Sequence, residues 1–211
     1  MIEKVLLLIR DELNAYFKTK NIAKDVVLDN IGLLETTSAD NLKDSIVITL
    51  VNIEEESTLK NGKNARISGI TSTAQYLNRP VHLNLYVLFT ANFTGGIHPN
   101  NAYIDGLSYL SFVILFLQGR NSFTVSTLAQ PLTGIADPAT DAEFLKMKVT
   151  LELYTLTFEQ VIHLWGSLGG RQIPFVMYKL RLVVLTERLV VREVPLIEEI
   201  ETNLSPNISG N

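Results

Sequence analysis

The chain has 211 residues, of which 46% are hydrophobic and 19% are charged. A chain of this length and composition can bury a core of its own, which excludes intrinsic disorder. The formal net charge of −4 argues against a nucleic-acid surface, because such a surface needs clustered Lys and Arg to displace counterions from phosphates. No cysteine is present, so disulfides and thiolate metal sites are excluded.

The first predicted element is an amphipathic helix over residues 2–18. Its apolar residues recur at helical spacing: Ile2, Val5, Leu6, Ile9, Leu13 and Phe17. Charged residues follow the apolar run 5–9 at once, so this run is too short for the core of a secretory signal, and we expect synthesis in the cytoplasm. Residues 25–43 are expected to be polar and irregular, with short apolar pieces at 26–28 and 31–34.

Two strands are predicted next, with a long polar segment between them. Residues 45–53 are apolar on both faces, as in a central strand. Residues 81–93 alternate between apolar and polar side chains, as in a strand with one face in the core. The segment 54–80 carries an Asn-Gly turn signal and is longer than a hairpin loop, so we expect a mobile loop or a projecting arm.

A second helix is predicted over residues 101–118. Its expected buried face consists of Leu107, Leu110, Ile114 and Leu117, widened by Val113 and Phe116. The apolar run 112–117 is too short to span a bilayer, so we expect no membrane partner. The Pro- and Gly-containing residues 120–142 are expected to form a surface connection.

The stretch 151–185 is predicted to form a strand, a capped helix, a turn and a second strand. Thr157 precedes Gln160 by three residues, which is the spacing of a capping box. The apolar face of this helix consists of Val161, Leu164, Trp165 and Leu168. Gly169 and Gly170 end it. The strand that follows alternates at Val176, Tyr178, Leu180, Leu182 and Val184.

Together these elements predict the α+β class, with a mostly antiparallel or mixed sheet and three main helices packed on it. We expect a single domain over residues 1–195, with the arm at 54–80 and the surface connection at 125–145. Residues 189–191 are expected to form either a last short strand or a continuation of the long strand before them. Residues 196–211 are expected to form a flexible C-terminal tail.

No arrangement of residues typical of catalysis or of cofactor binding is apparent. The histidines His82, His98 and His163 show no metal-ligand spacing and have no marked carboxylate partner. The glycines at 166, 169 and 170 close a helix, whereas a phosphate loop opens one. We therefore predict no catalytic residue, no cofactor and no metal.

The charged residues in and before the polar arm are candidate subunit contacts: Glu54, Glu55, Glu56, Lys60, Lys63, Arg66 and Arg79. The acidic run 54–56 either ends a strand in solvent or forms an acidic contact for a basic neighbouring subunit. Trp165 is the candidate core anchor of its helix, with an anchor at an interface as the alternative.

Five stretches resemble one family of proteins: the helix that starts at residues 1–2, VITLVNIEEE (47–56), LNLYVLFTANF (83–93), YIDGLSYLSFVILFLQGRNSFT (103–124) and residues 151–185. They resemble the cap or tail-terminator proteins of extracellular contractile injection systems, the phage-tail-like particles of the antifeeding-prophage and virulence-cassette type. Residues 151–185 are the most specific of these stretches. The segment 125–146 and the tail after residue 195 match least well.

The resemblance implies a tail-terminator-like fold and a structural role without enzymatic activity, cofactor or nucleic acid. It implies a ring of six copies at the baseplate-distal end of the particle, where the ring ends growth of the inner tube and anchors the last sheath layer. The implied partners are further copies of the chain, the tube protein and the sheath protein, and a second cap protein stays open. The protein made in the cytoplasm would thus become part of a phage-tail-like particle.

Two other functions stay open at the level of sequence. One is an adaptor or another structural component of the same particle. The other is a small hydrolase, which would need a catalytic arrangement that the sequence does not show.

Overall fold

The computed structural model describes residues 1–33, 42–60, 65–68, 73–93, 101–125, 142–169, 171–186 and 190–195. The chain forms two compact units, the first of residues 1–59 and 81–185 and the second of residues 60–80 and 186–211. Most of the segment 54–80 therefore belongs to the second unit. The expected single domain over 1–195 stays a prediction, and the expected tail 196–211 lies outside the described residues.

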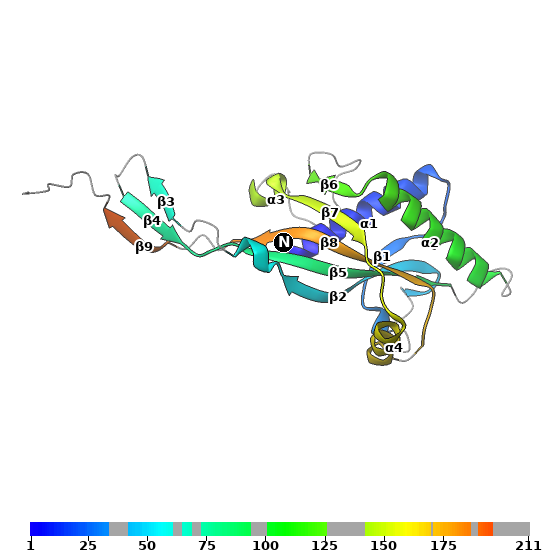
Figure 1. The fold of residues 1–211 in the computed structure, drawn as a ribbon. Coiled ribbons are helices and arrows are strands. Elements are labelled where there is room, and N and C mark those ends of the chain that lie inside the picture. Colours follow the sequence, from blue (N-terminus) through cyan, green and yellow to red (C-terminus); the bar gives the residue numbers. More distant parts are fainter. Residues whose placement is uncertain are drawn as a thin grey trace, which may run out of the picture. The chain divides into compact units, whose positions relative to one another are not determined.

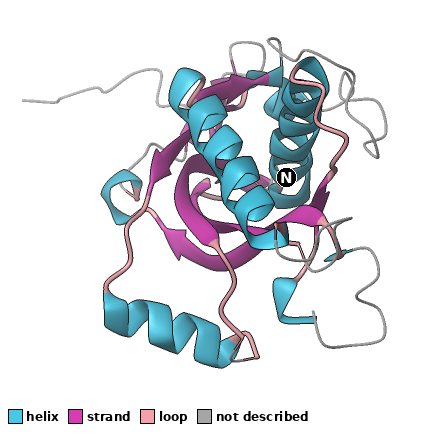
Figure 2. Ribbon diagram, turned by 90° about the vertical axis from the view of Figure 1, so that its right-hand side faces the viewer, coloured by secondary structure: helices cyan, strands magenta, loops and turns pink. Residues whose placement is uncertain are grey.

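The first unit is built on a six-stranded mixed sheet that curls on itself (Figure 2). Its strand order is β1 (Val26–Leu28), β2 (Ser45–Glu55), β5 (Val81–Asn92), β8 (Phe175–Leu185), β7 (Lys148–Leu153) and β6 (Ser122–Thr124). β1 and β2 are parallel, and the other neighbours are antiparallel. The predicted α+β class with a mostly antiparallel sheet is confirmed.

Three main helices cover the two faces of this sheet, as predicted. Figure 1 shows α1 (Ile2–Thr19) and α2 (Ala102–Gly119) on one side of the sheet and α4 (Phe158–Ser167) on the other. Each face of the sheet has its own apolar cluster. The first cluster lies between the sheet and helices α1 and α2, and the second lies between the sheet and α4. Successive side chains of a strand point to opposite faces, so one strand contributes to both clusters. In β2, Ile46 and Ile48 belong to the first cluster, and Val47 between them belongs to the second. Among the described residues, the unit also contains the short helices η1 (Ile31–Leu33), η3 (Ser57–Leu59) and α3 (Ala142–Lys146).

The buried face of α1 is the face that the spacing predicts. Val5, Ile9, Leu13 and Phe17 are fully buried against the sheet. One charged residue shares this face, because Glu12 is buried and forms an ion pair with Arg120, which follows α2. A buried carboxylate needs such a partner, so the pair links α1 to the end of α2.

The buried face of α2 differs from the predicted one. Leu110, Val113 and Leu117 are buried, as expected, but Leu107 and Ile114 are exposed. The buried stripe is completed instead by two small residues, Ala102 and Gly106. A Cβ atom at position 106 would lie 3.3 Å from Phe93 Cδ2 and 3.4 Å from Ala91 Cβ, so a glycine there lets the helix lie close to β5. The prediction was wrong because α2 is apolar on nearly every side, which leaves no hydrophobic periodicity to identify the inner face.

By length and composition alone, α2 is the one helix among the described residues that is apolar enough to cross a membrane. Its stripe of buried leucine and valine side chains belongs to the core cluster that it shares with α1. Packing in the core therefore explains why the inner side of α2 is apolar. No contact within the described part of the first unit explains why its exposed side is apolar too.

The helix α4 begins and ends as its sequence predicts. Thr157 Oγ1 accepts a hydrogen bond from the Gln160 amide at 3.3 Å, and the Gln160 side chain accepts one from the Thr157 amide at 2.9 Å. This reciprocal capping box satisfies two backbone donors at the helix start. Gly169 follows the helix with φ of +104°, a conformation that suits glycine because it has no Cβ. Gly170 lies outside the described residues.

The long strand β8 departs from simple alternation near its end. Tyr178 and Leu180 face the first core cluster, as predicted, but Val183 and Leu185 follow them there in place of Leu182 and Val184. The pairing of β8 with β5 shifts register at this point, between Leu83 and Leu85 of β5. A register shift moves every later side chain to the opposite face, and a sequence pattern does not reveal where it occurs.

The region 25–43, expected to be irregular, contains β1, the short edge strand of the sheet. The side chain of Asn14 on α1 donates to the Val26 carbonyl at 2.9 Å and accepts from the Val26 amide at 2.8 Å. It thus satisfies both outward backbone groups of Val26 in place of a further strand.

The second unit contains a three-stranded antiparallel sheet in the order β3 (Ala65–Ser68), β4 (Thr73–Leu77) and β9 (Val190–Pro195). The predicted last strand near residues 189–191 therefore exists as β9, and its partner is β4. The polar segment 60–80 and the chain after residue 185 are held together by this pairing. Sequence patterns give no hint of it, because the two segments are more than a hundred residues apart.

Candidate functional site

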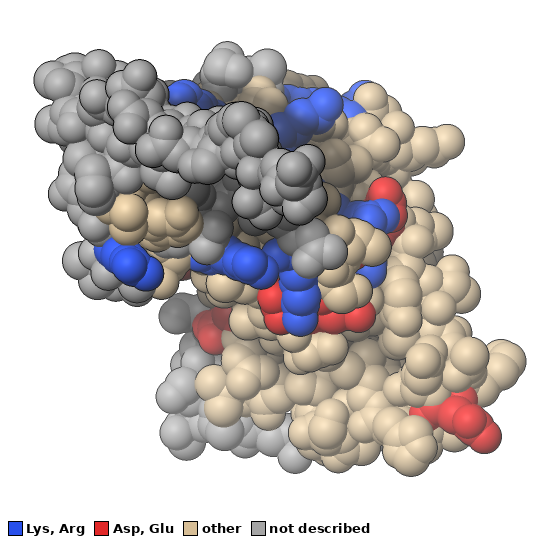
Figure 3. All heavy atoms as spheres, turned by 60° about the vertical axis from the view of Figure 1, so that its left-hand side comes forward, with Lys and Arg blue, Asp and Glu red and all other residues tan. Residues whose placement is uncertain are grey.

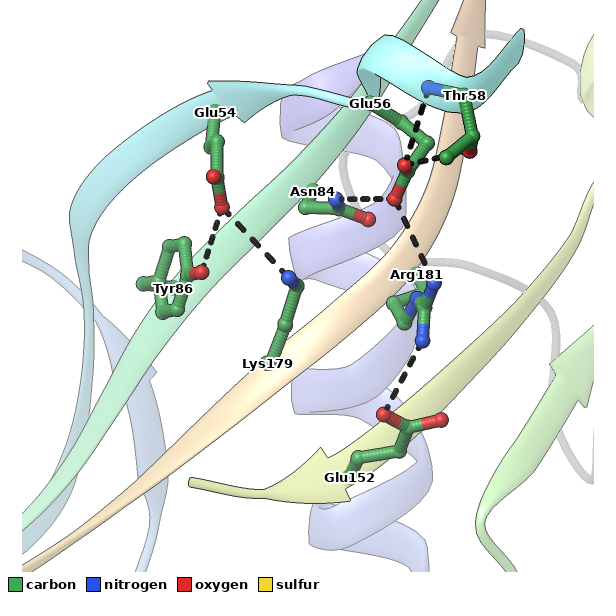
Figure 4. Close-up of polar contacts among 8 residues, drawn as sticks. All are labelled: Glu54, Glu56, Thr58, Asn84, Tyr86, Glu152, Lys179 and Arg181. Atoms are coloured by element: carbon green, nitrogen blue, oxygen red, sulfur yellow. Dashed lines mark hydrogen bonds and ion pairs between the residues drawn. The ribbon is translucent and has the colours of Figure 1, made fainter. Parts of the chain in front are cut away.

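The acidic run at the end of β2 lies in a polar network that crosses four strands of the first unit. Glu54 and Glu56 belong to β2 or follow it directly, and Figure 4 shows them directed toward side chains of β5 and β8. The network lies where the end of β2 pairs with the start of β5. It contains Glu54 and Glu56, two of the three acidic residues that the sequence marked as candidate contacts, so we describe it as the candidate site.

Glu54 is held by a tyrosine and a lysine. Tyr86 on β5 donates its hydroxyl to Glu54 Oε2 at 2.6 Å, and Lys179 Nζ on β8 lies 3.6 Å from the same oxygen. The same ammonium group lies 5.3 Å from the centroid of the Tyr86 ring, within the range of a cation–π contact.

Glu56 is held more completely, because both of its carboxylate oxygens have partners. Oε2 accepts from Asn84 Nδ2 at 3.0 Å and lies 3.4 Å from Arg181 Nη2. Oε1 accepts from the Thr58 hydroxyl at 2.7 Å. Arg181 extends the network to β7, since its Nη1 lies 3.6 Å from Glu152 Oε2. Acidic side chains at the end of β2 and on β7 therefore meet the basic side chains of β8, and the neutral Asn84 and Tyr86 of β5 join them (Figure 4). Such cross-strand pairs stabilise a sheet.

These contacts lower the pKa of both carboxyl groups. The Tyr86 hydroxyl, followed by the nearby Lys179 ammonium, holds the pKa of Glu54 below its usual value. Hydrogen bonds from Asn84 and then from Thr58 lower the pKa of Glu56 to about 2, with a smaller contribution from Arg181. Both groups are therefore ionised at neutral pH. Such carboxylates are suited to fix the position of their neighbours and poorly suited to accept protons as general bases.

The other candidate contacts lie apart from this network. Lys60 and Arg79 belong to the second unit, are exposed, and are linked by a hydrogen bond of 3.3 Å from the Arg79 guanidinium to the Lys60 carbonyl. Glu55 is exposed at the end of β2. Arg66 belongs to strand β3, and Lys63 lies outside the described residues. The candidates thus divide into an acidic group on the first unit and a basic group on the second.

Six partners in the network were missed at the level of sequence: Thr58, Asn84, Tyr86, Glu152, Lys179 and Arg181. A signal for the last two was available, because Lys179 and Arg181 are the two charged residues on one face of an otherwise apolar strand. Charged side chains two residues apart in such a strand indicate a polar patch on that face. Which acidic residues they meet depends on the pairing of β8 with β5 and β7.

One hollow on the same face brings a histidine near the network. It has a volume of about 490 Å³, and its lining includes Glu54, Tyr86, Tyr154, Gln160 and His163. Glu54 is already engaged by Tyr86 and Lys179, so it is poorly placed to act on a bound substrate with the histidine. No group of three or more His, Asp or Glu suited to a metal ion occurs among the described residues.

The remaining residues singled out in the sequence lie elsewhere. His82 is half-buried on β5, and His98 lies outside the described residues. Trp165 is buried in the cluster between α4 and the sheet, where its ring lies 5.5 Å from that of Phe175. This position is that of a core side chain.

Figure 3 shows the acidic and basic side chains gathered next to one another on one face of the molecule, while the lower part of that face, where α4 lies, carries few charged side chains. The pairing of opposite charges within one surface leaves little net charge there. The arrangement therefore stabilises the strand ends.

The chain matches one family model and is similar in fold to solved structures. A family model described as the Pvc16 N-terminal domain matches residues 4–199. The fold is similar to that of a sheath/tube terminator of an extracellular contractile injection system, PVC, in its extended state, with a TM-score of 0.60 and 14% identity over 100% of this chain. It is also similar to the tube-terminating cap of the anti-feeding prophage, with a TM-score of 0.57 and 16% identity over 96% of this chain. The chain spans 65% and 59% of the lengths of these two proteins. A search of curated protein sequences finds no match.

Proposed function

The chain belongs to the Pvc16 N-terminal domain family, and from this membership we propose that it is a structural cap subunit of a contractile injection system. In this role it forms a ring at the baseplate-distal end of the particle, ends growth of the inner tube and anchors the last sheath layer. The family match over nearly the whole chain carries the proposal. The folds shared with a sheath/tube terminator and with a tube-terminating cap support it.

The mechanism is geometric. A tube is a stack of rings in which each ring presents a surface for the next, and a terminator ends the stack by matching one such surface without presenting another. The first unit suits this task because two apolar clusters, one on each face of its sheet, hold it in a fixed shape. The role needs no enzymatic activity and no cofactor.

The partners in this proposal are six copies of the chain in a ring, the tube protein and the sheath protein, with a second cap protein left open. We propose that the second unit contacts a neighbour in the particle. Its candidate residues Lys60, Lys63, Arg66 and Arg79 are all basic, so the partner surface is acidic. Its sheet of three short strands has little opportunity to bury a core alone, which favours packing against another subunit.

Removal of the polar segment tests this role of the second unit. The Glu56 amide donates to the His82 carbonyl at 2.8 Å, so β2 and β5 already lie in hairpin register at their ends. Residues 58–80 are therefore replaced by Asn-Gly, a turn that joins two paired strands. We expect the first unit to keep its thermal stability, followed by fluorescence of Trp165, and the variant to fail as a cap.

The readout is the length of tubes assembled from the tube and sheath proteins of the same particle, measured by electron microscopy. Wild-type protein should give tubes of uniform length, and the variant should give longer tubes of scattered length. A charge variant with Lys60→Glu and Arg79→Glu should show the same defect, with Lys18→Glu at the exposed end of α1 as the matched control. Uniform tube lengths with the shortened chain would contradict the role of the second unit, and scattered lengths with the wild-type chain would contradict the cap itself.

A further inference from the structure

Two exposed apolar surfaces remain in the first unit after the fold is complete. One lies on α2 and the other on α4, and no described part of the chain covers either. Single exposed apolar side chains are ordinary, but contiguous exposed apolar surface on a helix marks a contact with another molecule.

The surface on α2 runs along the side of the helix that faces away from the core. Tyr103 is 63% exposed, Ile104 is 62% exposed and Leu115 is 56% exposed, and Leu107 and Ile114 lie between them on the same face. The polar members of this face are Ser108, Ser111 and Gln118, so it carries no charge. Small serines at its centre let another backbone or side chain approach closely.

The surface on α4 is smaller and protrudes. Phe158 at the helix start is 91% exposed, and Ile162, one turn later, is 71% exposed. Gly166 follows at the next turn, with nothing within 4 Å of the position that a Cβ would occupy. The three positions form one stripe, since residues four apart lie on the same side of a helix. Val161, Leu164 and Trp165 anchor another side of α4 to the sheet, next to this stripe.

The two surfaces face different directions within one compact unit. α2 covers one face of the sheet and α4 covers the other (Figure 1). An isologous dimer through either surface would leave the other surface exposed. A head-to-tail contact, in which the α2 surface of one copy meets the α4 surface of the next, covers both with one type of interface, and such a contact forms a ring where its rotation closes.

The area of the two surfaces suits such a contact. With about 200 Å² for each fully exposed large side chain, the α2 surface offers about 500 Å² and the α4 surface about 300 Å². A specific interface buries about 1,600 Å² in total, of which somewhat more than half, about 900 Å², is apolar. The two surfaces together supply nearly this amount.

We propose that the α2 surface of one copy (Tyr103, Ile104, Leu107, Ile114 and Leu115) packs against the α4 surface of the next (Phe158, Ile162 and Gly166), joining copies head to tail. This contact rests on the proposed cap function, because it would join the copies of the proposed ring. The occupant of each surface is a second copy of this chain, with Phe158 as the protruding anchor that enters the uncharged face of α2.

Site-directed cross-linking tests the pairing, because the chain has no cysteine of its own. Ser111→Cys places a thiol on the α2 surface, and Glu159→Cys places one beside Phe158. The full-length variants are assembled with the tube and sheath proteins of the same particle and treated with a short bis-maleimide. Lys18→Cys paired with Glu159→Cys is the control, since residue 18 is exposed at the end of α1.

The proposal expects a distinct pattern of products. Each single variant should give no cross-linked dimer, a mixture of the two should give dimers only, and the double variant should give a ladder that ends at the number of copies in the ring. Dimers of the Ser111→Cys variant alone would overturn the proposal in favour of an isologous α2 contact. The absence of any ladder from particles that are capped normally would overturn it while leaving the cap function intact.

A second variant tests the anchor without affecting folding. Phe158→Ser should leave thermal stability unchanged, because the side chain is almost fully exposed, yet weaken association of copies roughly 30-fold, as expected for a central anchor. Unchanged association would contradict the contact. If wild-type protein instead co-sediments with phosphatidylcholine vesicles through Tyr103 and Ile104, the α2 surface faces a lipid and the proposal fails.

Discussion

The ion pair between Glu12 and Arg120 offers the sharpest test of how the first unit is held together. Glu12 is 4% exposed on the inner face of α1, and the side chain of Arg120 is 32% exposed after α2. The Arg120 guanidinium also lies 4.9 Å from the centroid of the Phe123 ring. The perturbation is Arg120→Met, which keeps an unbranched apolar chain beside that ring and removes the charge.

We expect Arg120→Met to lower the free energy of unfolding by about 3 kcal/mol. Removing one partner of a buried ion pair costs roughly 3–5 kcal/mol, because the remaining charge stays buried. We expect the lower end of this range because the side chain of Arg120 is partly exposed, so water screens the ion pair. For a chain of this size, about 3 kcal/mol corresponds to a fall in Tm of roughly 6–12 °C.

The assay is urea denaturation at neutral pH, followed by fluorescence of Trp165, the one tryptophan of the chain. Since Trp165 is buried in the first unit, the signal reports that unit. The double variant with Glu12→Leu and Arg120→Met should recover about 2 kcal/mol, because it removes the buried charge as well. Lys24→Met is the matched control: its ion pair with Asp44 is long, at 3.9 Å, and partly exposed, so less than about 1 kcal/mol is expected. A loss below about 1 kcal/mol for Arg120→Met, or a double variant weaker than the single one, would refute the reasoning.

Three further predictions concern other parts of the fold. The pKa of Glu56 is lowered from 4.5 to about 2, so its contribution to stability is complete above pH 4.5 and is lost as the pH falls to about 2. Thermal denaturation should therefore show a smaller loss of stability between these pH values for Glu56→Gln than for wild type. Equal losses of stability in the two proteins would contradict the network. Asn14→Ala should cost about 1–3 kcal/mol, since it removes the side chain that satisfies the outward backbone groups of the buried Val26. Sedimentation should detect association through the open edge of β1; a monodisperse variant of unchanged stability would count against this capping. Leu110→Ala should cost about 2–5 kcal/mol and Leu107→Ala less than about 1 kcal/mol, because only Leu110 is buried; comparable losses for the two variants in urea denaturation would support the face predicted from the sequence, which included both leucines.

The sequence by itself determined the elements whose signals are local. The alternation over residues 81–93 predicted β5, the spacing of Thr157 and Gln160 predicted the start of α4, and the stripe from Val5 to Phe17 predicted the buried face of α1. These signals are reliable because a strand period, a helix period and a cap each depend on residues within a few positions of one another. The resemblance of residues 151–185 and the other stretches to a family of cap proteins likewise needed only the sequence.

Only the tertiary structure decided which surfaces and segments meet. The inner face of α2 depends on where Gly106 allows close packing on β5, since an apolar pattern on all sides does not choose a face. The partners of Glu56 include Arg181, 125 positions away, and β4 pairs with β9 across a similar separation. Such contacts are set by the pairing of distant strands, and local periodicity carries no information about them.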